Sequence, residues 1–236
     1  MKKVITLLTR LSFLFIISTA TADIIYLDDG GSHMFNNDLH DSQFFLDYNI
    51  ANDPGTSLEL SGGGIVSNIV AHNNSSVEIN GGTVNYTLEA HGNSYITVNS
   101  GTVYTYVHSF DSSTLTINGG IFYEQIRSHD AGRINISGGL IDSYLTAEDG
   151  RIYLYGSDFR VNGISLGSGT GLRQFGILDS YGMWLKNTIT GTLQDGSELN
   201  LNYYILNSND GNIIIVPEPM TLSLLALGGL LIRKRK

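Results

Sequence analysis

Acidic and imidazole side chains recur at a fixed spacing in the middle of this chain, and they are the residues best able to do chemistry. Asp111, Asp130 and Asp149 follow one another at a constant 19-residue interval, and so do His72 and His91. If 19-residue units stack about 4.8 Å apart, the three carboxylates form a column that could hold Ca²⁺, which prefers several oxygen ligands. Two stacked imidazoles could share a transition metal. A solvated turn without a ligand is the plainer alternative, because Asp is an ordinary turn residue.

The acidic column also raises the alternative of a carbohydrate-active enzyme. Hydrolysis of a glycosidic bond uses two carboxyl groups about 5–9.5 Å apart, a spacing that this column could provide. A polysaccharide lyase would also need a base, and the basic residues nearby in the sequence are Arg127, Arg133 and Arg151. Active sites usually interrupt a repeat with loop insertions, whereas these units are short and uniform. The regularity favours a protein that is not an enzyme, with no catalytic residue assigned, and a polysaccharide lyase or hydrolase is the alternative.

Tyrosines recur on the same repeat and suggest contact with sugars. Tyr104 and Tyr123 occupy the tenth position of their units, and Tyr106 and Tyr144 occupy the twelfth. Flat aromatic rings beside Asn and Asp side chains suit sugar rings, so these four tyrosines are predicted saccharide-binding residues. Tyrosine also favours strands for ordinary packing reasons, which is the alternative.

An internal repeat positions all of these residues. In every full unit the second and fourth residues are aliphatic and the residue between them is polar, as in Leu58, Glu59 and Leu60, which is the alternation of a strand with one buried face. A Gly-Gly or Ser-Gly pair follows, and it predicts a turn with positive φ. The aliphatic spacing does not fit the hexads of a left-handed β-helix. The sequence therefore predicts an all-β fold, a right-handed parallel β-helix with short 19-residue rungs. The units, the last of them degenerate, begin at Ser57, Ser76, Tyr95, Thr114, Arg133 and Arg151.

Two further positions of the unit carry structural predictions. The fifth position holds Asn80, Asn99 and Asn118 in successive units, and we expect their side chains to form an amide ladder. The ninth position is expected to point inward, and its residues are Ile65, Val84, Val103, Phe122 and Ile141.

The repeat divides residues 23–216 into three segments. Residues 57–163 form the predicted β-helix. Its open ends would expose strand edges that invite aggregation, so both ends need covering. Residues 23–56 are expected to form an irregular N-terminal cap. Residues 164–216 are expected to form a C-terminal β cap, with a hairpin around Asp195-Gly196 and a last strand at 212–216.

Composition and charge exclude some functions. The chain has no cysteine, so neither disulfides nor thiol ligands are available. Seven of the 13 basic residues and one of the 22 acidic residues, Glu218, lie in the terminal segments. Residues 23–216 therefore contain 6 basic and 21 acidic residues and have a net charge of −15. Such an acidic body repels DNA, RNA and anionic lipid, so nucleic-acid binding is not expected. No cofactor is expected unless the acidic column binds calcium.

Residues 1–22 have the three parts of a secretory signal peptide. Three cations precede the apolar stretch 11–17, which is expected to be helical. Ala20 and Ala22 occupy the small-residue positions of a cleavage site. Export of the mature chain from Asp23 is therefore predicted.

The C-terminal segment, 217–236, has three parts in a fixed order. Pro217, Glu218 and Pro219 come first, and an apolar stretch too short for a standard membrane span follows. Four cations end the chain, namely Arg233, Lys234, Arg235 and Lys236. A short apolar helix followed by cations suits a transient hold in the membrane with the cations on the cytoplasmic side.

This tail resembles the PEP-CTERM sorting signal. The resemblance implies recognition by an exosortase-type membrane protease in a Gram-negative bacterium, removal of the tail, and release or attachment outside the cell. It also implies an association with exopolysaccharide. An ordinary hydrophobic C-terminal anchor is the alternative. We therefore expect an exported structural or adhesive protein of the cell surface, cell envelope or extracellular matrix.

Overall fold

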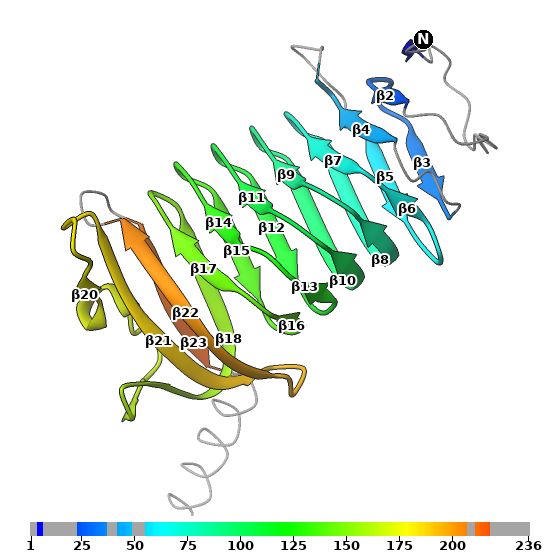
Figure 1. Ribbon diagram of the computed structural model, residues 1–236. Coiled ribbons are helices and arrows are strands. Elements are labelled where there is room, and N and C mark those ends of the chain that lie inside the picture. Colours follow the sequence, from blue (N-terminus) through cyan, green and yellow to red (C-terminus); the bar gives the residue numbers. More distant parts are fainter. Residues whose placement is uncertain (1–3, 7–22, 37–41, 49–54, 207–210, 218–236) are drawn as a thin grey trace, which may run out of the picture.

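The computed structural model describes residues 4–6, 23–36, 42–48, 55–206 and 211–217. These residues form an all-β fold, a parallel β-solenoid of about six turns (Figure 1). The one helical element in the described ranges is a short 3₁₀ turn, η1 (Leu172–Phe175). The prediction of a parallel β-helix built from stacked repeats is thus confirmed.

A first ladder of parallel strands runs the length of the solenoid. Its strands pair in register, so that Leu58, Val77 and Ile96 are neighbours in three successive rungs. Each rung adds one strand to this ladder because the aliphatic pair at the second and fourth positions occurs once in every unit of the repeat. In chain order the strands are β3 (Ser32–Phe35), β5 (Ser57–Leu60), β8 (Ser76–Val84), β10 (Tyr95–Val103), β12 (Thr114–Ile117), β15 (Arg133–Ile136), β18 (Arg151–Val161) and β23 (Asn212–Pro217).

A second ladder closes the other side of each rung, and a short third ladder joins the two. The third ladder comprises β6 (Ile65–Val66), the ends of β8 and β10, β13 (Ile121–Phe122) and β16 (Leu140–Ile141). The second ladder comprises β2 (Ile24–Leu27), β4 (Gln43–Leu46), β7 (Asn68–Ala71), β9 (Leu88–Ala90), β11 (Val107–Ser109), β14 (Ile126–Ser128), β17 (Tyr144–Ala147) and β22 (Glu198–Leu206).

The core is a set of aliphatic columns inside the rungs. The fourth position of the repeat is almost fully buried in every unit, as the alternation predicts, from Leu60 at 1% exposure to Leu154 at 0%. No single rung could bury these side chains by itself, because each side chain packs on its equivalents in the neighbouring rungs.

The inward ninth position is confirmed in four units and wrong in the first. Val84 pairs with Val66, not with Ile65, and Val66 is buried while Ile65 is only partly so. The first unit has three glycines in its turn, and one extra residue moves the following side chains to the other face. The segment before Ile69 is one residue shorter, so the 19-residue register is restored there.

The glycine turn has the geometry that its sequence predicts. Gly82 and Gly101 have φ values of 82° and 108°, and an added Cβ on Gly101 would lie 2.9 Å from the Gly82 carbonyl oxygen. The amide ladder beside this turn is also confirmed. Asn99 donates to the side-chain oxygen of Asn80 at 2.8 Å, and Asn118 donates to that of Asn99 at 2.9 Å.

The N-terminal segment is more regular than an irregular cap. Residues 23–56 contribute β2, β3 and β4, which continue both ladders by parallel pairing with β4, β5 and β7. Of residues 1–22 the structure describes β1 (Val4–Thr6), which is a strand paired with β2 and not part of a helix.

The C-terminal end carries the predicted hairpin. β21 (Trp184–Leu193) and β22 are antiparallel and are joined at Asp195-Gly196, where Gly196 N–H donates to the Leu193 carbonyl at 2.9 Å. Figure 1 shows this hairpin at the end of the solenoid opposite β2 and β3. Two short strands, β19 (Ile164–Ser165) and β20 (Ile177–Leu178), pair with β18 and β21. The last strand, predicted at 212–216, is β23.

The two address segments fall almost entirely outside the described residues. This holds for Ala20 and Ala22 of the signal peptide and for the sorting motif after Pro217, which ends β23. Within the described ranges, no helix has the length and apolar character required to cross a membrane.

Candidate functional site

Rings stack in a column along the outer side of the second ladder, at the ends of its strands. The rings of His72 and His91 are stacked with centroids 4.8 Å apart, and those of His91 and Phe110 with centroids 4.5 Å apart. Phe110 in turn stacks on His129 at 4.3 Å. Tyr48 meets His72 edge-on at 5.0 Å and extends the column toward the N-terminal end. We call these five residues the ring column.

The ring column ends on a carboxylate. Glu148 follows His129 in the next rung, and its Oε2 lies 2.7 Å from His129 Nδ1. Arg127 Nη2 donates to the same oxygen at 2.7 Å. The carboxylate therefore fixes the orientation of the last imidazole and neutralises the neighbouring guanidinium.

A second outward column lies beside the ring column and consists of Glu89, His108 and Arg127. These residues are neighbours in register on β9, β11 and β14. Glu89 Oε2 lies 3.1 Å from His91 Nε2, and the His108 ring meets Phe110 edge-on with centroids 5.5 Å apart. Ion pairs and ring contacts thus join the two columns into one surface.

The imidazoles of His72, His108 and His129 favour the neutral state. Burial lowers the pKa of His108 to about 4, and the charges of His129, Arg127 and His91 act in the same direction against the opposing effect of Glu89. Burial, followed by His91, also lowers the pKa of His72. For His129, burial and Arg127 outweigh the 2.7 Å contact with Glu148, so its pKa is lowered too. The surface is therefore uncharged at these three rings near pH 7.

The geometry of the imidazoles suits ring stacking better than metal binding. His72 and His91 have ring planes only 15° from parallel, so their nitrogen lone pairs run side by side and do not converge on one point. Nε2 of His72, His108 and His129 is buried without a hydrogen-bond partner among the described residues. In the same part of the chain, no group of three or more His, Cys, Asp or Glu side chains is arranged to hold a metal ion.

Two of the four predicted saccharide-binding tyrosines form a pair. Tyr104 and Tyr123 stack with centroids 5.2 Å apart and planes 9° from parallel, and both are more than 40% exposed. Tyr106 is exposed and its ring contacts that of His108 with centroids 5.6 Å apart, so it adjoins the second outward column. Tyr144 lies two rungs further along and meets Tyr204 edge-on at 5.2 Å.

The rung between Tyr106 and Tyr144 keeps these two rings apart. Gln125 occupies the equivalent position there, is buried, and donates to Thr146 Oγ1 at 2.7 Å. The predicted set of four tyrosines is thus a stacked pair and two separate rings.

The predicted calcium column consists of turn residues. Asp111 and Asp130 adopt left-handed backbone conformations, with φ of 54° and 49°, and Asn73 does the same two rungs before Asp111. Asp111 Oδ2 accepts a hydrogen bond from the backbone N–H of Gly92 at 2.9 Å. Asp149 is exposed at the corresponding turn of the fifth unit. The fixed spacing of these acids is therefore explained by the turn that each rung makes.

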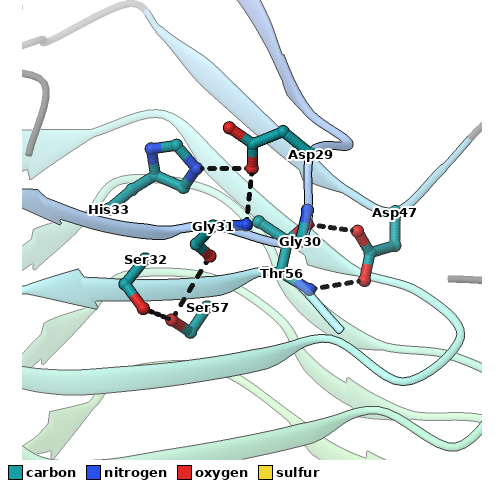
Figure 2. Close-up of polar contacts among 8 residues, drawn as sticks. All are labelled: Asp29, Gly30, Gly31, Ser32, His33, Asp47, Thr56 and Ser57. Carbon is teal, nitrogen blue, oxygen red and sulfur yellow. Dashed lines mark hydrogen bonds and ion pairs between the residues drawn. The ribbon is translucent and has the colours of Figure 1, made fainter. Parts of the chain in front are cut away.

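A polar cluster near the N-terminal end was not predicted from the sequence. Figure 2 shows Asp29 beside His33, with Asp29 Oδ1 2.9 Å from His33 Nε2 and 2.8 Å from the Gly31 amide nitrogen. Asp47, which is fully buried, accepts hydrogen bonds from the backbone N–H and the hydroxyl of Thr56. These carboxylates fix the turns between β2, β3 and β5.

The cluster contains serine, histidine and aspartate but does not form a nucleophile–base pair. The hydroxyl of Ser57 donates to Ser32 Oγ at 2.8 Å, and no hydrogen bond joins either hydroxyl to His33 within the described residues. The cluster therefore has a structural role in this arrangement. All of its residues except Ser57 precede the first 19-residue unit, so the repeat did not indicate it.

The fold and the surface define the chain as a parallel β-solenoid protein with a column of stacked rings on its outer side. Comparisons of the chain with protein-family models, with curated proteins and with solved structures gave no match.

Proposed function

We propose that this chain is an exported structural or adhesive protein that contacts extracellular polysaccharide through rings on the outside of its second ladder. The observation that carries the proposal is the ring column, which continues without interruption from Tyr48 to His129. The stacked rings cover one another's faces, so the column presents a continuous strip of weakly polar ring edges to solvent, and such a strip can pack against the apolar faces of sugar rings.

The stacked tyrosines provide a second platform for the same polymer. Tyr104 and Tyr123 are exposed and nearly parallel, and Tyr106 lies between this pair in the sequence and contacts His108 of the second outward column in space. Platforms that repeat once per rung match a polymer better than a single small molecule, since a polymer can occupy several platforms at once.

The uniform rungs support a scaffold or adhesive role. The units between residues 57 and 150 contain no inserted loop, and each successive unit contributes the next strand of each ladder. The acidic body, with its net charge of −15 over residues 23–216, argues against nucleic acid as a partner. We further propose that the solenoid is right-handed, as parallel crossovers almost always are.

The terminal segments support export and sorting. The signal peptide with cleavage positions Ala20 and Ala22, and the tail with its PEP motif and four final cations, are the basis for this part of the proposal. We propose that an exosortase-type protease removes the tail after a transient membrane stage. The cell surface or the extracellular matrix is then the destination.

Sorting is tested by expression in a Gram-negative host that has an exosortase. Replacing Pro217, Glu218 and Pro219 with alanine should leave the tail uncleaved and the protein in the membrane fraction. Replacing Asn200, an exposed residue of β22, serves as a matched control. Cleavage of the alanine variant at the wild-type rate would contradict the proposal.

The binding proposal is tested with a glycan array probed with residues 23–216, with and without calcium. Retention of the protein on polysaccharides is expected, and Tyr104→Ala with Tyr123→Ala should reduce it. Failure to bind any polysaccharide would contradict the adhesive role and leave only a scaffold.

The alternative function is a polysaccharide lyase or hydrolase. Its support is the acidic series Asp111, Asp130 and Asp149, two of whose carboxylates lie on adjacent rungs beside arginines. To test for this activity, the polysaccharides of the array are incubated with the protein and then assayed for new reducing or unsaturated ends. Release of such ends, abolished by Asp130→Asn, would favour the enzyme.

A further inference from the structure

A surface depression lies where β15 and β18 begin. Its volume is about 410 Å³, and its lining includes Asp130, Arg133, Asp149, Arg151 and Tyr153. The two arginines are the first residues of their strands, and the two aspartates belong to the turns that precede these strands.

Two like charges are placed side by side in this depression. Arg133 and Arg151 are register partners in the parallel pairing of β15 with β18, so their backbones are about 4.8 Å apart. Both side chains are exposed. Like charges directly opposite each other on adjacent strands destabilise a sheet. Residues 23–216 contain only six basic residues, and two of them are paired here. The pairing therefore needs an explanation beyond folding.

Neither arginine forms an ion pair with a carboxylate among the described residues. The ion pairs there involve His33, His91, Arg127 and His129, and none of them includes Arg133 or Arg151. Asp130 and Asp149 share the depression without making such a contact. The guanidinium groups thus retain N–H donors that can bind an external oxyanion.

Tyr153 holds the guanidinium of Arg133 in position. Arg133 Nη2 donates to Tyr153 Oη at 3.1 Å, and Arg133 Cζ lies 4.5 Å from the centroid of the same ring. The hydrogen bond from Arg133 lowers the pKa of Tyr153, and the charge of Arg151 acts in the same direction, although burial opposes them. A guanidinium that is held by a phenol oxygen and by the face of its ring is oriented before any ligand arrives, which reduces the entropy that binding must offset.

We infer that Arg133 and Arg151 bind an oxyanion substituent of an acidic polysaccharide, with the phenol of Tyr153 as the positioning group of Arg133. This inference rests on the proposed polysaccharide contact and names the class of polymer. The two guanidinium groups provide local attraction for an oxyanion, whereas the net charge of −15 over residues 23–216 repels polyanions elsewhere on the surface. Arginine pairs suit planar carboxylates and the oxygens of sulfate esters. The carboxylates of Asp130 and Asp149 are placed to accept hydrogen bonds from the hydroxyl groups of the same sugar.

The full chain is tested by titration with three polymers in the presence of EDTA. Polygalacturonate carries carboxylates, dextran sulfate carries sulfate esters, and dextran is neutral. Comparison of the three polymers separates the two sources of oxyanion, and EDTA removes any calcium that could bridge protein and polymer. The variants are the double substitution Arg133→Gln with Arg151→Gln, Tyr153→Phe, and Arg160→Gln. Arg160 is an exposed arginine of β18 outside the depression, so it controls for the loss of charge.

The double variant should bind the preferred acidic polymer about tenfold or more weakly, because each arginine contributes charge-assisted hydrogen bonds. Tyr153→Phe should cause a smaller loss, and Arg160→Gln should change affinity by less than about twofold. Binding to dextran should be unchanged in all variants. If the double variant does not fold, as judged by circular dichroism, the single arginine variants carry the same expectation.

The outcomes separate this inference from the proposed function. Wild-type binding to dextran but to neither acidic polymer would overturn the oxyanion site and leave the polysaccharide contact standing. Equal losses in Arg160→Gln and in the double variant would also overturn the site, since they would show an effect of net charge. If the wild type binds none of the three polymers, both proposals are overturned.

Discussion

His91 and Phe110 are one full unit of the repeat apart in the sequence, yet their rings stack with centroids 4.5 Å apart and planes only 5° from parallel. The rung length produces this contact, because one unit of the repeat returns the chain to the same place one strand spacing further on. The surface chemistry of the protein therefore follows the same period as its core. A change in rung length would displace both together.

The interior columns should dominate the stability of the fold. Leu115→Ala removes a side chain that is 0% exposed and leaves a cavity between rungs, so we expect the free energy of unfolding to fall by about 2–5 kcal/mol. Leu140→Ala makes the same substitution at a side chain that is 53% exposed and should cost well under half as much. Urea denaturation followed by circular dichroism measures both. Similar losses for the two variants would argue against the buried column.

Gly101 in the glycine turn should tolerate no side chain. Gly101→Ala places a Cβ 2.9 Å from the Gly82 carbonyl oxygen at a φ of 108°, and we expect it to lower the free energy of unfolding by about 1–3 kcal/mol. Gly63→Ala is the matched control, since nothing lies within 4 Å of its added Cβ and its φ is not positive. Thermal denaturation of the two variants should separate them clearly. An unchanged melting temperature for Gly101→Ala would be inconsistent with this turn.

The buried imidazoles should make stability depend on pH. His108 takes up a proton near its ordinary pKa of about 6.5 in the unfolded chain, but only at about 4 in the folded protein. The unfolded state therefore binds more protons between these values, and the free energy of unfolding should fall as the pH is lowered from 6.5 to 4. His72 and His129, whose pKa values are also lowered, act in the same direction.

His108→Gln tests this pH dependence. The groups that face His108 are Glu89, His91, Arg127 and His129, and all of them remain in the variant. Its melting temperature should therefore decline less steeply than that of the wild type between pH 6.5 and 5, before the carboxylates begin to titrate. Parallel curves for the two proteins would refute the assignment of His108.

Much of the fold was predictable because it follows one period. The repeat showed which aliphatic residues align, and it correctly predicted the amide ladder of Asn80, Asn99 and Asn118. The hairpin at Asp195-Gly196 followed from its turn residues. The repeat failed at Ile65, where a third glycine shifts the register by one residue, a change that the constant unit length conceals. Periodicity shows alignment well and local insertions poorly.

The surface was less predictable than the core. The histidine spacing pointed to His72 and His91, but the partners Glu89, Arg127 and Glu148 differ in type from unit to unit and give no repeating signal. Tyr48 precedes the first unit and does not keep the 19-residue spacing from His72, although β4 and β7 bring it to the end of the ring column. Tyr106 and Tyr144 share a position in the unit but not a surface, because the buried Gln125 occupies the rung between them.

The proposed contact with polysaccharide is tested most directly by measuring the affinity of the Tyr48→Ala, Phe110→Ala double variant, which removes two rings of the ring column, for a polymer that the wild type binds on the array. Tyr181→Ala provides the control, because Tyr181 is 85% exposed and lies outside the repeats. We predict that the double variant binds about tenfold more weakly, a loss of ~1.4 kcal/mol, while the control is unchanged. Equal affinity of the double variant and the wild type would contradict the account.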